Sequence, residues 1–172
     1  MAQLNSRGTL TRSRWDYFEQ TNGWASVYGS VTSGGIGAYF ANNSTGSLAL
    51  DIYNFTWFAS VAVPWNVTLF VPPLVLTAFT PTDSEVHASQ PDRATLAGVV
   101  GMYSASASPF FTIQRISNQV QSGIVEPVAG QPFVTLPPGW AIGIGGFAGT
   151  NPCELSLNVW YQEVTDNIAP AP

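Results

Sequence analysis

The residues LSLNVWYQ, positions 155–162, carry the clearest β-strand pattern of the sequence. Their odd-numbered positions hold Leu, Leu, Val and Tyr, whereas their even-numbered positions hold Ser, Asn, Trp and Gln. Successive side chains of a β-strand point to opposite faces, so this alternation predicts a strand with one face on a core. Trp160 then lies on the polar face of that strand.

Similar short patterns recur along the chain, separated by turn residues, and no window has the period of a long amphipathic helix. About ten short strands spaced roughly 8–12 residues apart predict an all-β, single-domain antiparallel β-sandwich, and the strand count favours a jelly roll. The predicted strands cover residues 24–31, 36–40, 48–53, 55–63, 66–71, 74–80, 96–103, 110–116, 119–126, 133–135, 140–144 and 155–162.

Three features predict where strands end. Pro64 lies between two apolar stretches and predicts a break there, because proline cannot donate to a ladder. Asn118 predicts a tight turn between the strands 110–116 and 119–126. The polar run 80–93, bounded by prolines, predicts the longest loop, and it contains the only histidine, His87.

The ends of the chain differ from its middle in charge. We expect a basic N-terminal arm over residues 1–20, a β-sandwich domain over 21–164 and an extended tail over 165–172. Residues 1–15 contain three arginines and no acid, whereas the rest of the chain contains two arginines and ten acids. Arg7, Arg12, Arg14 and Trp15 therefore predict an arm that docks on a partner, although these arginines would also simply solubilise a terminus.

The rest of the composition limits the partners. Charged residues make up only 9% of the chain and lysine is missing, against about 25% charge in an ordinary soluble domain. Such a surface favours a protein that is partly covered by partners, and its acidic body disfavours nucleic acid. Residues 51–83 carry no charge between the two terminal aspartates, but prolines and polar residues interrupt them, so no membrane span is expected. Residues 1–14 lack the apolar core of a signal peptide.

Catalytic patterns are weak, and we expect no enzyme activity, cofactor or metal. His87 and Cys153 lie in different segments, and the acids nearest His87 share its polar run. The run 143–148, GIGGFA, matches a dinucleotide fingerprint in form, but a glycine and a proline follow instead of a helix. Glu154 and Glu163 should point to opposite faces of one strand, about 30 Å apart, too far for a glycosidase pair.

Six tryptophans leave two interpretations open. Aromatic side chains pack well inside sheets, yet flat indoles also suit sugar rings. Trp160 is the strongest candidate for an exposed group, either as an anchor for a neighbouring subunit or as a platform for a sugar.

The segments FVTLPPGWAI, residues 133–142, and LSLNVWYQEV, residues 155–164, resemble the paired late strands of jelly-roll virion proteins. They are also similar to the decoration (cement) proteins and head-fibre bases of tailed bacteriophages. The resemblance implies a homotrimer in the virion, bound to other virion proteins such as the major capsid protein. The expected function is therefore capsid decoration, and the alternative is a carbohydrate-binding or receptor-binding β-sandwich of a phage tail or fibre.

Overall fold

The computed structural model describes residues 3–4, 10–11, 22–45, 48–71, 78–88, 97–104, 111–125 and 131–165, and no helix occurs in these ranges. Every strand pair in them is antiparallel, which confirms the predicted all-β antiparallel sandwich. The strands are β1 (Gln3–Leu4), β2 (Leu10–Thr11), β3 (Asn22–Val31), β4 (Gly35–Asn42), β5 (Leu48–Phe70), β6 (Ala78–Phe79), β7 (Asp83–Ala88), β8 (Gly98–Tyr103), β9 (Phe111–Val125), β10 (Val134–Leu136), β11 (Ala141–Phe147) and β12 (Cys153–Thr165).

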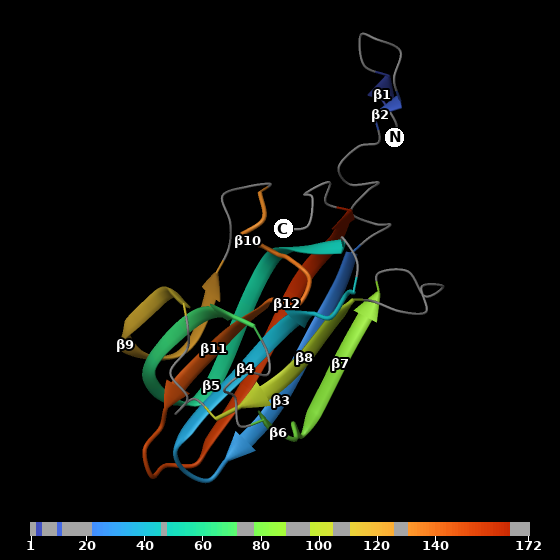
Figure 1. The fold of residues 1–172 in the computed structure, drawn as a ribbon. Helices are drawn as coiled ribbons and strands as arrows, with labels where there is room; N and C mark the ends of the chain where they lie inside the picture. Colours follow the sequence, from blue (N-terminus) through green and yellow to red (C-terminus); the bar gives the residue numbers. More distant parts are fainter. Residues whose placement is uncertain are drawn as a thin grey trace.

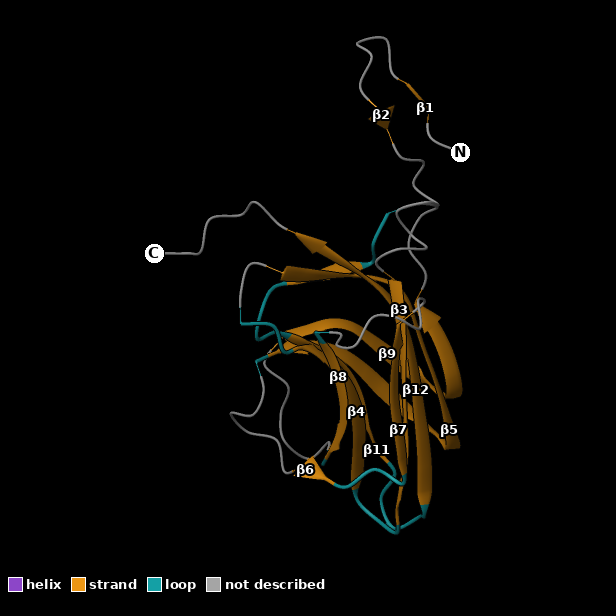
Figure 2. Ribbon diagram, turned by 90° about the vertical axis from the view of Figure 1, so that its right-hand side faces the viewer, coloured by secondary structure: helices purple, strands orange, loops and turns teal. Residues whose placement is uncertain are grey.

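Ten of these strands form one hydrogen-bonded sheet that folds over on itself into two layers (Figures 1 and 2). Eight of them follow a single path of neighbours, and β9 and β10 pair with β5 beside that path. The fold-over occurs along β5, a strand of 23 residues. Residues 48–59 of β5 pair with β12, whereas residues 65–70 pair with β11. β9 follows β5 through both layers on its other side. The first layer thus has the order β7-β3-β12-β5, and the second has β6-β8-β4-β11-β5.

The two layers are joined by strand pairs that wrap as a ribbon. β3 and β12 pair in the first layer, and their chain neighbours β4 and β11 pair in the second. The crossings at 32–34 and 148–152 run side by side, because the Gly34 N–H donates to the Gly149 carbonyl and the Ala148 N–H donates to the Gly34 carbonyl. Both glycines have positive φ, 95° and 69°, which favours glycine at these bends. This wrapping of paired strands around two layers is like that of a jelly roll, with β5 joining the layers in one continuous sheet.

The segment between β5 and β9 extends both layers. β7 pairs with β3 at the edge of the first layer, and β8 pairs with β4 in the second. Figure 1 shows β7 and β8 next to each other. The sandwich is therefore closed on one side by β5 and β9 and bordered on the other by β7 and β8.

The core lies between the layers and is lined by alternate residues of the long strands. Trp65, Phe55 and Phe40 are its largest fully buried groups apart from Tyr161. In β12 the predicted alternation is confirmed, since the odd-numbered apolar residues from 155 to 161 are at most 1% exposed. Burial of one large apolar side chain contributes about 1.5–3 kcal/mol, so this core supplies most of the stability of the sandwich.

Two predicted breaks are wrong. β5 continues through Pro64, and β9 continues past Asn118 while it remains antiparallel to β5. Pro64 falls between the part of β5 that pairs with β12 and the part that pairs with β11, and the β9 register also shifts beside it. Proline has no backbone N–H, but where β5 changes its partner from β12 to β11 no ladder hydrogen bond is lost for this reason.

The predicted loop 80–93 is also wrong over residues 83–88, which form β7. These polar residues form an edge strand, because pairing with β3 satisfies one side of the backbone and solvent can satisfy the other. The predicted arm residues Arg7, Arg12, Arg14 and Trp15, and the tail after Thr165, lie outside the described residues.

Candidate functional site

The side of the first layer that faces away from the core is the candidate site, and we call it the outer face. On β3 and β12 its residues alternate with the fully buried ones, so that inner and outer sets are separated by strand parity. The outer face is formed by Glu85 and His87 of β7, Trp24, Ser26 and Tyr28 of β3, Ser156, Asn158 and Trp160 of β12, and Asn54, Thr56 and Phe58 of β5.

An aromatic row crosses the outer face. His87 is the direct partner of Trp24, Trp24 is the partner of Trp160, and Trp160 is the partner of Asn54. Trp160 is 54% exposed and Trp24 is 37% exposed. Opposite residues of an antiparallel pair have their Cβ atoms about 4.5–5.5 Å apart, so the two indoles start from neighbouring points.

His87 supports one end of this row. Its ring stacks on Trp24 with centroids 4.4 Å apart and an interplanar angle of 18°. Its Nε2 lies 3.0 Å from Oε2 of Glu85, two residues back on the same side of β7. The imidazole is therefore fixed by one ring face and one nitrogen, and it limits the movement of Trp24.

This placement separates His87 from Asp83 and Ser84 of the same polar run, and the acid beside it is Glu85. Asp83 lies four residues along β7, about 13 Å away in an extended strand. Ser84 belongs to the other parity of the strand, as its partner Val27 is buried. Asp92, another acid of the polar run 80–93, lies outside the described residues.

A polar row and a second aromatic row follow along the strands. Ser26, Asn158 and Thr56 form the polar row, and the Thr56 hydroxyl donates to the Asn158 carbonyl at 3.5 Å. In the next row lie Tyr28 and Phe58, and Phe58 is 56% exposed. Partial desolvation, together with a hydrogen bond to Glu154 and the charge of its carboxylate, raises the pKa of Tyr28. The phenol thus remains a protonated hydrogen-bond donor at neutral pH.

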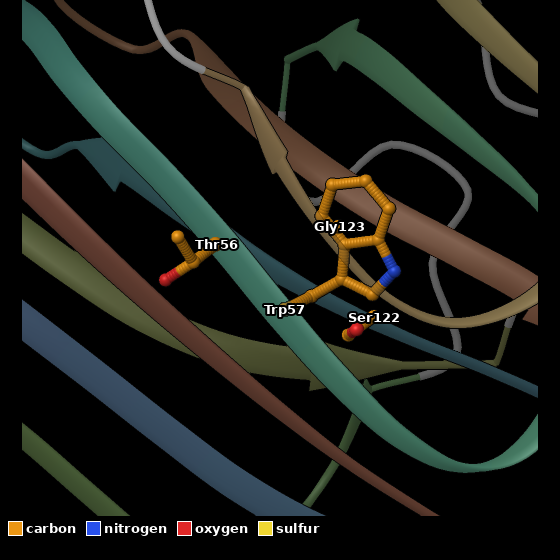
Figure 3. A pocket seen from close by; sticks show the side chains of 4 residues that line it. All are labelled: Thr56, Trp57, Ser122 and Gly123. Atoms are coloured by element: carbon orange, nitrogen blue, oxygen red, sulfur yellow. The ribbon is translucent and has the colours of Figure 1, made fainter.

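A shallow hollow of about 350 Å³ lies where β5 and β9 pair, and four residues line it: Thr56, Trp57, Ser122 and Gly123 (Figure 3). Trp57 packs so closely on Gly123 that a Cβ at position 123 would overlap the indole. The Trp57 N–H is buried and has no hydrogen-bond partner within the described part of the chain. Since Thr56 also belongs to the polar row, the hollow adjoins the outer face.

Other residues singled out from the sequence lie apart from the outer face. Cys153 is fully buried at the start of β12, and desolvation is the main cause that raises the pKa of its thiol. Glu154 is exposed and Glu163 is buried, which confirms that they point to opposite sides. Glu163 accepts a hydrogen bond from the Ala97 N–H at 2.8 Å, so this carboxylate connects β12 to the chain before β8.

The run 143–148 also has a structural role, since residues 143–147 belong to β11 and lie in the second layer. Gln162, expected on the polar face, is only 5% exposed. Over the described ranges there is no group of three or more His, Cys, Asp or Glu residues with the geometry to hold a metal ion. Those ranges also contain no helix with the length and hydropathy needed to cross a bilayer.

Trp160 is exposed as the sequence predicts, but its neighbours were missed. The alternation over residues 24–31 places Trp24 on the same side as Ser26 and Tyr28, opposite the small residues that are buried. That signal could have identified Trp24 as an exposed residue. Nothing local to the sequence indicates that β3 lies between β12 and β7, and this order is what brings Trp24, Trp160 and His87 together.

Comparison with known proteins adds no family to this description. A scan against protein-family models produces no match, and a search among curated proteins produces none either. The functional argument therefore rests on the geometry of the chain itself.

Proposed function

We propose that this chain is a structural subunit of a virion, a capsid-decoration protein of a tailed bacteriophage that works as a homotrimer. The jelly-roll wrapping of β3, β4, β5, β9, β11 and β12 is the observation that carries the proposal. Viral capsid proteins use this fold repeatedly, and its closed, strand-rich shape gives a rigid block that tolerates dense packing. The same fold also occurs in lectins, so the fold alone does not distinguish a capsid protein from a sugar-binding protein. The properties of the surface must distinguish these two functions.

The charge of the chain supports a role inside an assembly. With no lysine and 9% charged residues, the protein has few of the mixed charges that keep a free monomer apart from its neighbours. A specific protein contact buries about 1,200–2,000 Å² in total. Three such contacts from one trimer would reinforce each other, since the second and third bind at high effective concentration.

The basic N-terminus is the proposed attachment segment. Arg7, Arg12 and Arg14 would pair with acidic groups of the capsid, and Trp15 would supply an apolar anchor. Burial of an indole contributes about 2–3 kcal/mol, and the arginines add specificity for an acidic surface. The acidic remainder of the chain cannot make this contact with the same surface.

Two measurements test the proposal. Light scattering of the purified protein should give about 55 kDa, three times the 18.4 kDa chain. Particles purified from the source should carry the protein on their outer shell, seen by electron microscopy with antibody labelling. A stable monomer at micromolar concentration, or a protein that never co-purifies with particles, would refute the proposal.

A truncation tests the attachment segment separately. Deletion of residues 1–15 should leave the melting temperature of the sandwich nearly unchanged and should abolish particle binding. A full-length variant with all three arginines changed to glutamine should lose most affinity at low salt, because ionic contacts are least screened there. Unchanged binding of the truncated protein would remove these residues from the attachment site.

A further inference from the structure

We propose that the outer face binds a neutral, β-1,4-linked glycan, with sugar rings stacked on Trp24 and Trp160. This goes beyond the proposed structural role and does not depend on it. The starting observation is that two indoles on adjacent strands are directly opposite each other and exposed, while the other tryptophans of the first layer's strands face the core. A pyranose ring has an apolar C–H face, which stacks on an indole, and a rim of hydroxyl groups.

The platform is held in place before any ligand binds. Trp24 is stacked on His87, and His87 is hydrogen-bonded to Glu85. Trp160 extends from the middle of β12 and Trp24 from near the start of β3, and both strands are paired on two sides. A site on rigid strands loses little conformational entropy on binding, which favours recognition of a ligand with few apolar contacts.

Side chains that could hydrogen-bond to the hydroxyl groups of a sugar lie beside the indoles. Asn54 is the partner of Trp160 on one side, and Asn158 lies two residues from Trp160 on the same face. An amide supplies both donors and an acceptor, as a sugar hydroxyl requires. Thr56 continues this row to the edge of the hollow between β5 and β9. The face thus combines apolar platforms with a few polar groups, as ligand sites do.

The acidic residues on and near the outer face favour a neutral glycan. Glu85 belongs to the outer face, and the exposed Asp83 and Glu154 lie near it on β7 and β12. Among the described residues of the face the one group that can become cationic is His87, and it is already beside Glu85. Sulfated or sialylated sugars would therefore be repelled. A neutral chain is favoured, and β-1,4 linkage gives the extended, flat shape that fits a row across three strands.

The pattern is less suited to a second copy of the chain. The core of a subunit interface is a contiguous apolar patch that is depleted of polar groups. Here Ser26, Asn158 and Thr56 separate the tryptophan row from the row of Tyr28 and Phe58. Closing such a face against protein would desolvate this polar row, whereas a glycan would hydrogen-bond to it.

The test uses the full-length protein and two probes, the hexamers of β-1,4-linked glucose and of β-1,4-linked N-acetylglucosamine. Calorimetry and tryptophan fluorescence should show saturable binding of at least one hexamer, with a dissociation constant of about 1 mM or tighter. A heparin-derived hexasaccharide should not bind. Trp160→Ala and Trp24→Ala should each weaken binding at least about tenfold. Trp160→Phe should retain part of the affinity, which separates loss of a platform from loss of fold.

Phe147→Ala is the matched control, because Phe147 is an aromatic residue that is 63% exposed at the end of β11 in the second layer. It should bind both hexamers as the original protein does. The proposal is overturned if neither hexamer binds at about 5 mM, since the expected affinity would be saturated there. It is equally overturned if Trp160→Ala binds normally, if the sulfated sugar binds better than both neutral ones, or if Trp160→Ala disrupts the oligomer of a protein that binds neither hexamer.

Discussion

The two faces of the first layer are formed by the same strands and have opposite chemistry. Leu155, Leu157 and Val159 of β12 are fully buried against the second layer, whereas Ser156, Asn158 and Trp160, one residue along in each case, form the outer face. Tryptophan occurs both in the core and on the outer face: Trp57 and Trp65 of β5 are buried, whereas Trp24 and Trp160 are exposed. Strand parity therefore decides whether an indole stabilises the fold or is available to a ligand.

The largest expected effect of a single change falls on the core between the two layers. Trp65→Ala removes an indole that is 0% exposed and leaves a cavity in the core. We expect a loss of about 3–5 kcal/mol in the free energy of unfolding, measured by urea denaturation. A loss below about 1 kcal/mol would show that the core does not depend on this side chain.

A smaller effect is expected where the inner face meets β9. Gly123→Ala places a Cβ in the position of the Trp57 ring, and the indole must move. We expect a loss of about 1–3 kcal/mol by the same measurement. The control is the Trp57→Leu variant, which lacks the indole ring. In that variant Gly123→Ala should lower the free energy of unfolding by clearly less. An equal cost in both backgrounds would contradict the packing of Trp57 on Gly123.

The buried thiol makes stability depend on pH. Burial raises the pKa of Cys153 above its ordinary 9.0, so the folded chain holds this proton more tightly than the unfolded chain. The thiol therefore has no effect on the free energy of unfolding well below pH 9, and it lowers that free energy as pH rises from about 9 toward the folded pKa. Relative to Cys153→Ala, the original protein should lose up to about 1 kcal/mol more between pH 7 and pH 10.

The tyrosines provide the internal control for this measurement. Burial also raises the pKa of Tyr103, and this phenol contributes equally in both proteins. Its effect cancels in the difference between them. An identical decline in the two proteins would show that Cys153 ionises as freely in the folded chain as in the unfolded one.

The smallest effect is expected on the outer face. Trp160→Ala removes a side chain that is more than half exposed, and the free energy of unfolding should change by no more than about 0.5 kcal/mol. Compared with Trp65→Ala, this variant measures the difference in stability contribution between the core and the outer face with the same substitution. A loss of several kcal/mol at Trp160 would mean that the outer face is part of the folded core.

The jelly-roll interpretation shows which parts of the structure were accessible from local pattern. Alternation over residues 155–162 was sufficient to predict the last strand, its buried side and the exposure of Trp160. The glycine-rich match at residues 143–148 was correctly placed outside a helix. In contrast, Pro64 and Asn118 were interpreted by their usual local preferences, and the long pairing of β5 with β9 and with two successive partners overrode both.

The candidate site divides in the same way. The sequence by itself determined an all-β chain, the burial parity of its strands and the charge contrast between its first 15 residues and the rest, because these depend on neighbours a few residues apart. Only the tertiary structure decided that β3 lies between β12 and β7, and hence that Trp24, Trp160 and His87 form one row. Strand order and register are set by contacts between residues more than 50 positions apart in the chain, and no local pattern encodes which strands will meet.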